Sequence, residues 1–207
     1  MKARKRDQFR SEIYRHLTQC FYRPYATIYE RILELSDAVC ELYPEFVKYL
    51  PDNVEETDLL LTDYTILLDE SASVSEQNGV ESLMEDVFYD NHGVMTEKII
   101  GLCKKAGFEI IGNFEPHHIA FLLQFAEFLL HKIFLVKGNS NARKDVSYYT
   151  TIFNDLLTVH LYPRMEYFYK LTLEKAKTKF YKNLGRFAYE FICEEVKFQK
   201  QANDGED

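Results

Sequence analysis

The stretch HIAFLLQFAEFLLHKIFLV, residues 118–136, is the longest apolar run in the sequence and decides the class of fold. A run of this length resembles a membrane span, but it is interrupted by the polar residues Gln124, Glu127, His131 and Lys132. Their spacing places Gln124, Glu127 and His131 on one stripe of an otherwise apolar helix. We therefore predict that this stretch forms a central helix buried in an all-α bundle.

The segments on either side of this run also have helical periodicity. Apolar residues recur three and four positions apart nearly everywhere, turn signals are few, and no window alternates as a strand does. The pattern predicts a compact all-α bundle of about nine helices. They are expected near 9–21, 25–42, 54–68, 81–89, 93–107, 116–136 and 148–159, in a helix that starts at Pro163, and near 180–191.

Two polar segments divide this helical pattern. Residues 69–79 and 137–145 are small and polar without periodicity, which indicates mobile linkers. We expect one all-helical domain over residues 1–198 with these two linkers inside it. Residues 199–207 are expected to be a disordered tail. Linkers of this kind also allow two copies to exchange helices and form a homodimer.

Composition excludes several classes of protein. Of the 207 residues 46% are hydrophobic, which is enough for a globular core, and the net charge of −8 disfavours binding to nucleic acid. The basic start MKARKR is followed by an amphipathic segment, so neither a signal peptide nor membrane insertion is expected. The cysteines form no C-x-x-C pair, which favours free thiols and a cytoplasmic location. They are Cys20, Cys40, Cys103 and Cys193.

Patterns that carry catalytic chemistry are missing from the sequence. It has no dinucleotide-binding, P-loop, nucleophile-elbow or zinc-protease motif. Glu127 and His131 are four apart without a second copy, unlike a di-iron site, and are better explained as a polar stripe. The adjacent His117 and His118 would point about 100° apart on a helix and so make a weak zinc pair. We expect no enzyme activity, metal or cofactor.

Several stretches, in order along the chain, resemble one protein family. They are YRHLTQCFYRP with Tyr14, Leu17, Phe21 and Pro24, DYTILL with Asp63, Tyr64, Leu67 and Leu68, the pair Glu81 and Ser82, EPHH over Glu115, Pro116, His117 and His118, and the pair His160 and Leu161. In this order they resemble the TorD/DmsD family of redox enzyme maturation chaperones, relatives of the nitrate reductase delta-subunit assembly proteins. The chain departs from that pattern at Leu68, which replaces an aromatic residue, at His117, which replaces aspartate, and at Arg164, which replaces tryptophan.

The resemblance implies a TorD-like helical fold and a specific function. Such chaperones bind the twin-arginine signal peptide or N-terminus of an apo-molybdoenzyme of the dimethyl sulfoxide reductase type and assist cofactor insertion before export. The partner is then the apo-catalytic subunit of a molybdopterin oxidoreductase. The peptide-binding residues that the resemblance implies are Tyr14, Phe21, Asp63, Tyr64, Leu67, Leu68, Glu81, Ser82, Glu115, Pro116, His117 and His118.

The residues themselves are compatible with this function but leave alternatives open. A peptide with two arginines beside an apolar segment needs carboxylates next to an aromatic and aliphatic groove. The DYTILL apolar residues also suit core packing, Glu115 and Pro116 suit a helix start, and His118 suits a buried histidine. The alternative classes are a helical ligand-sensing regulator, which needs a basic helix-turn-helix that the first 50 residues lack, and another interaction module without catalytic activity.

Overall fold

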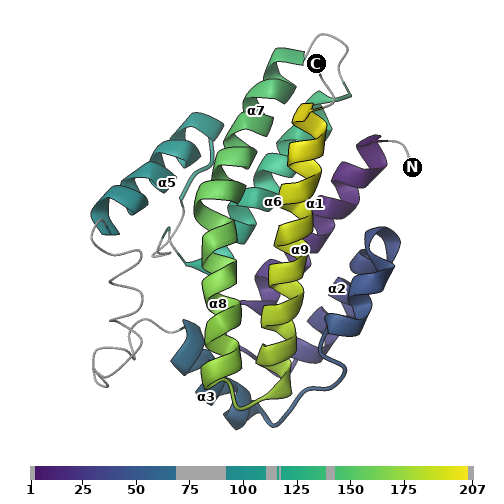
Figure 1. Ribbon diagram of the computed structural model, residues 1–207, viewed down its shortest axis with the longest axis vertical. Coiled ribbons are helices and arrows are strands. Elements are labelled where there is room, and N and C mark those ends of the chain that lie inside the picture. Colours follow the sequence, from purple (N-terminus) through teal and green to yellow (C-terminus); the bar gives the residue numbers. More distant parts are fainter. Residues whose placement is uncertain (1–2, 69–91, 111–115, 117, 139–142, 205–207) are drawn as a thin grey trace.

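Helix α6, Ile119–Val136, is the central helix of the bundle, as the apolar run predicted (Figure 1). The computed structural model describes residues 3–68, 92–110, 116, 118–138 and 143–204. Within them, α6 packs against α1, Ala3–Cys20, and α7, Arg143–Asp155. By length and composition α6 could cross a membrane, but 56% of its residues are buried inside the bundle.

The described residues contain eight α-helices and no strand, so the all-α prediction is confirmed. The predicted helix over 81–89 lies outside these residues. So do the whole linker 69–79 and part of the linker 137–145. The remaining helices are α2 (Ile28–Leu42), α3 (Thr57–Leu68), α5 (His92–Ala106), α8 (Tyr162–Lys175) and α9 (Lys179–Asp204), with a 3-10 helix over Pro44–Tyr49.

The helices pack so that α1 lies between α2 and α6, while α8 and α9 form an antiparallel pair beside them (Figure 1). A π-helical turn, Leu156–Leu161, joins α7 to α8 without a loop, and Pro163 occupies the first turn of α8 as predicted. The pair α8 and α9 approaches closely at Gly185, where a Cβ atom would lie 2.6 Å from Thr172 Oγ1. Helix α3 packs against α8 and α9 at the end of the bundle away from the chain termini.

Helix ends follow local chemistry in two places and depart from the sequence prediction in a third. Gly107 has a φ of 70° and ends α5, as expected for glycine after a helix. Helix α6 begins at Ile119, with His118 as its N-cap. Helix α9 continues to Asp204, although a tail was predicted from residue 199. The guanidinium of Arg6 lies 3.9 Å from the ring centroid of Phe198, so this end of α9 is packed against α1.

Candidate functional site

Asp63, expected to bind a peptide, instead caps a helix. Its side chain is fully buried at the junction of α3 and α9. One carboxylate oxygen accepts hydrogen bonds from Thr178 N at 2.8 Å and from Thr178 Oγ1 at 2.6 Å, and both oxygens accept from Lys177 N at 3.0 Å. Glu55 accepts from the next amide, Lys179 N, at 2.6 Å. The two carboxylates stabilise the positive N-terminal end of α9, so Asp63 has a structural role in this fold.

Tyr14 and Phe21, the aromatic residues of the first stretch, belong to the core. Neither has any exposed surface. The Tyr14 ring packs edge-on against Phe191 at a centroid distance of 5.1 Å, and the Phe21 ring lies 5.0 Å from that of Phe168. In this conformation neither side chain offers a surface to a peptide.

Helix α3 exposes two large apolar side chains on the flank next to Asp63. Leu67 and Leu68 are each only 8% exposed and Tyr64 is half-buried, but Leu59 is 46% and Ile66 38% exposed. Leu59 and Ile66 are seven residues apart, which places them on one side of the helix. The stretch TDLLLTDYTILL already indicates this exposure, because a short helix that is apolar on more than one face cannot bury every apolar side chain in one core.

The start of α6 holds the part of the EPHH stretch that the structure describes. Pro116 and His118 are both half-buried. The Nδ1 atom of His118 accepts a hydrogen bond from Ala120 N at 3.1 Å, so the ring caps the helix. The remaining predicted binding residues lie outside the described part of the chain. They are Glu81, Ser82, Glu115 and His117.

His160, from the later His-Leu pair, is a buried histidine in the π-helical turn. It is 6% exposed, and its Nδ1 atom has no hydrogen-bond partner. Burial, together with the positive charges of Arg164 and Lys98, lowers the pKa of His160 below its ordinary value. The ring is therefore held in its neutral form inside the bundle.

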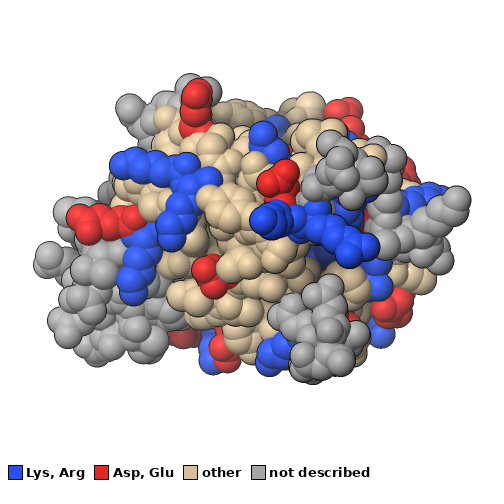
Figure 2. All heavy atoms as spheres, turned by 90° about the horizontal axis from the view of Figure 1, so that it is seen from above, with Lys and Arg blue, Asp and Glu red and all other residues tan. Residues whose placement is uncertain are grey.

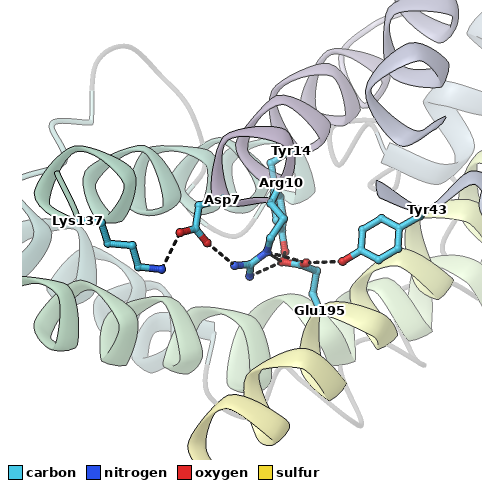
Figure 3. Close-up of polar contacts among 6 residues, drawn as sticks. All are labelled: Asp7, Arg10, Tyr14, Tyr43, Lys137 and Glu195. Atoms are coloured by element: carbon cyan, nitrogen blue, oxygen red, sulfur yellow. Dashed lines mark hydrogen bonds and ion pairs between the residues drawn. The ribbon is translucent and has the colours of Figure 1, made fainter. Parts of the chain in front are cut away.

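A buried charge network, which no sequence pattern indicated, joins four segments of the fold (Figure 3). Glu195 of α9 has no exposed surface and accepts from Arg10 Nε at 2.9 Å and Arg10 Nη2 at 2.7 Å. The hydroxyl of Tyr43, just after α2, donates to the same carboxylate at 3.2 Å. Asp7 lies 3.3 Å from Arg10 Nη1 and 2.6 Å from the ammonium of Lys137, just after α6.

Electrostatics within the network favour the charged pair. Burial alone would lower the pKa of Arg10, but the charge and hydrogen bonds of Glu195 outweigh burial and raise it. Burial and the charge of Glu195 also raise the pKa of Tyr14, whose hydroxyl donates to Glu195 at 3.4 Å. The Arg10–Glu195 pair therefore stays charged, while the hydroxyls of Tyr14 and Tyr43 stay neutral. Apart from the exposed Lys137, its members are buried, so the network connects helices rather than binding a ligand.

Charged side chains of both signs cover the end of the bundle seen in Figure 2. This is the end where α1 starts and α9 finishes, and Lys and Arg side chains lie there among several Asp and Glu side chains. Exposed cations of this end include Lys137, Lys144, Lys197 and Lys200. Helix α3 lies toward the other end, and the sequence that follows it, 69–91, contains Asp and Glu but neither Lys nor Arg.

The fold and these contacts define an all-α helical bundle whose described residues contain no group of three or more His, Cys, Asp or Glu able to hold a metal ion. Comparison of the chain with protein-family models, curated proteins and solved structures finds no match. The function of the chain must therefore be inferred from its sequence stretches and from the surface that the fold gives them.

Proposed function

We propose that this chain is a system-specific cytoplasmic chaperone of the TorD type. It binds the twin-arginine signal peptide or N-terminus of an apo-molybdoenzyme of the dimethyl sulfoxide reductase type and assists cofactor insertion before export. Its partner is the apo-catalytic subunit, and it has no catalytic activity of its own. The proposal starts from the family resemblance, and the structural observation that carries it is the exposed apolar face of α3, formed by Leu59 and Ile66.

This face has the properties that an apolar peptide segment needs. Leu59 and Ile66 are large side chains without a covering element among the described residues, so a peptide that covers them gains hydrophobic free energy. Tyr64 lies on another side of the same helix, half-buried against the core. Pro116 and His118 are the other predicted binding residues that keep exposed surface. We therefore narrow the proposed binding surface to these residues and assign Tyr14, Phe21 and Asp63 to the fold.

The net charge of the chain favours a basic peptide. A twin-arginine peptide is attracted over a long range to an acidic protein. The acidic sequence 69–91 follows α3 directly, and the chain as a whole has a net charge of −8. Long-range attraction of this kind raises the association rate and falls with added salt.

Calorimetry with synthetic twin-arginine peptides tests the proposal. Ile66→Ser removes one exposed apolar side chain from α3, and we expect about a fivefold weaker complex from the lost burial of about 1 kcal/mol. Leu173→Ser is the matched control, because Leu173 is a 56% exposed leucine on α8, and it should leave binding unchanged. The proposal fails if no peptide gives heat at about 50 μM protein, a concentration at which micromolar complexes are detected. Equal losses in the two variants would refute the assignment to α3.

A further inference from the structure

Arg15 and His16 are neighbours on α1, the helix that packs between α2 and α6. Arg15 is exposed, whereas the side chain of His16 is only 14% exposed. The Nη2 atom of Arg15 lies 3.2 Å from Nε2 of His16, and Nδ1 of His16 lies 3.2 Å from Oε2 of Glu34 on α2. The imidazole ring is therefore held between a guanidinium and a carboxylate.

These two neighbours determine which nitrogen of the His16 ring carries the proton. A guanidinium has only donors, so Nε2 must offer its lone pair to Arg15. The proton of the neutral ring then lies on Nδ1, which faces the acceptor oxygens of Glu34. The Nδ1 atom is buried, and its contact with Glu34 lacks the alignment of a hydrogen bond. The arrangement fits a neutral ring, and it leaves Glu34 close enough to pair with a charged one.

The charged groups around His16 act in opposite directions. Burial and the charge of Arg15 lower the pKa of His16, and the carboxylates of Glu34 and Glu12 offset this effect only in part. The thiol of Cys20, one turn further along α1, stays protonated because burial raises its pKa to about 12. His16 is therefore the group of this set that changes charge near neutral pH.

Arg15 also borders a groove of about 430 Å³ between α1 and α6. Two carboxylates line this groove, Glu12 of α1, three residues before Arg15, and Glu127 of α6. Burial raises the pKa of Glu127, and the charges of Arg15 and His131 offset this effect in part. Residues three apart on a helix are neighbours on its surface, so the guanidinium of Arg15 can reach Glu12 by a change of rotamer. It thus has two alternative acceptors, Nε2 of His16 and the carboxylate of Glu12.

We propose that His16 is a pH-sensitive latch for Arg15. The neutral ring holds the guanidinium at Nε2, and protonation replaces this acceptor with a donor and a positive charge. Arg15 then turns into the groove and pairs with Glu12, while the charged ring pairs with Glu34. The groove keeps its negative charge at neutral pH and is partly neutralised in acid. The inference does not depend on the proposed function, because it involves no residue of α3 or of the start of α6.

An NMR titration of the isotope-labelled full chain, from about pH 7.5 to about pH 5, tests the latch. At the neutral end the ring nitrogen signals of His16 should show the proton on Nδ1. As the pH falls, the Nε signal of Arg15 should move with the same midpoint as the ring. Arg15→Gln should raise this midpoint and Glu34→Gln should lower it, each by roughly half a pH unit, the size expected for a partly exposed charge pair.

The matched control for Glu34 is Glu41→Gln. Glu41 is an exposed carboxylate on the same helix, about 10 Å further along α2, so its removal should leave the midpoint of His16 unchanged. Equal shifts in the Glu34→Gln and Glu41→Gln chains would indicate only a general effect of net charge and would contradict the latch.

Two variants of His16 test the latch without acid. His16→Lys places a permanent positive charge beside Arg15 and should move the Nε signal of Arg15 to its acid position at about pH 7.5. His16→Gln keeps an acceptor oxygen without a titratable group and should hold that signal in place throughout the titration. Circular dichroism at each pH checks that the chains are folded. A neutral ring with its proton on Nε2 overturns the proposal, and so does an Arg15 signal that neither follows His16 nor moves in His16→Lys.

Discussion

Replacing Glu195 by glutamine should cause a large loss of stability. Glu195 is fully buried and accepts hydrogen bonds from Arg10 Nε at 2.9 Å and Arg10 Nη2 at 2.7 Å, and from the hydroxyls of Tyr43 at 3.2 Å and Tyr14 at 3.4 Å. Glutamine offers one acceptor oxygen, and its amide group turns donors toward a guanidinium that has only donors. Arg10 then stays buried with Asp7, at 3.3 Å, as its remaining counter-ion. Breaking a buried pair from one side costs about 3 to 5 kcal/mol.

Urea unfolding followed by circular dichroism measures this loss. With an m-value of about 2.5 kcal/mol per molar urea, a cost of about 4 kcal/mol moves the midpoint down by about 1.6 M. The control is Glu166→Gln on α8, which breaks the exposed pair between Lys170 Nζ and Glu166 Oε1 at 2.8 Å. Exposed i, i+4 pairs are worth about 0.4 kcal/mol, so that midpoint should move by about 0.2 M.

A double variant separates the charge effect from the loss of contacts. Arg10→Met combined with Glu195→Leu removes both charges and keeps apolar volume between α1 and α9. It should recover more than half of the stability that Glu195→Gln loses, because no unpaired buried charge remains. The reasoning is refuted if Glu195→Gln shifts the midpoint no more than Glu166→Gln does.

Three further changes test the fold. Asp63→Asn should lower the free energy of unfolding by about 2 kcal/mol and speed hydrogen exchange at the start of α9, because the cap loses its charge. Gly185→Ala should cost about 1 to 3 kcal/mol in urea unfolding, since its Cβ would lie 2.6 Å from Thr172 Oγ1, and less in a Thr172→Ala background. The pKa of His160 is lowered in the folded chain. Below the ordinary histidine pKa of 6.5, the unfolded chain therefore binds more protons than the folded chain does. Stability should therefore fall as the pH drops from about 7 to about 5, and this fall should be smaller in His160→Gln.

The helices could be predicted because burial of one face imposes a period on the sequence. The stretch 25–42 predicts α2 closely, and the start of α8 at Pro163 follows from the special tolerance for proline in a first turn. The end of α9 could not be predicted in this way. Residues 199–204 are polar except for Ala202, and Phe198, just before them, packs against Arg6, a contact between the two ends of the chain.

The candidate site was harder to predict because motif residues and core residues share the same chemistry. An aromatic residue on an apolar stripe, such as Tyr14, is compatible with a groove wall and with a core, and only the position of Phe191 decides between them. Asp63 bonds to Thr178, 115 positions later, and Arg10 bonds to Glu195, 185 positions later. Periodicity contains no information about pairs at such separations.

Helix α1 combines the two polar features of this protein on different sides. Asp7, Arg10 and Tyr14 are three and four residues apart and lie on the side that meets Glu195. Glu12, two positions after Arg10, is rotated about 200° around the helix from it and lies in the groove with α6. Because these two sides contact different helices, their roles separate experimentally. A change at Glu195 should lower stability in proportion to the charge it leaves unpaired, while a change at the half-buried Glu127 of α6 should leave the urea midpoint nearly unchanged.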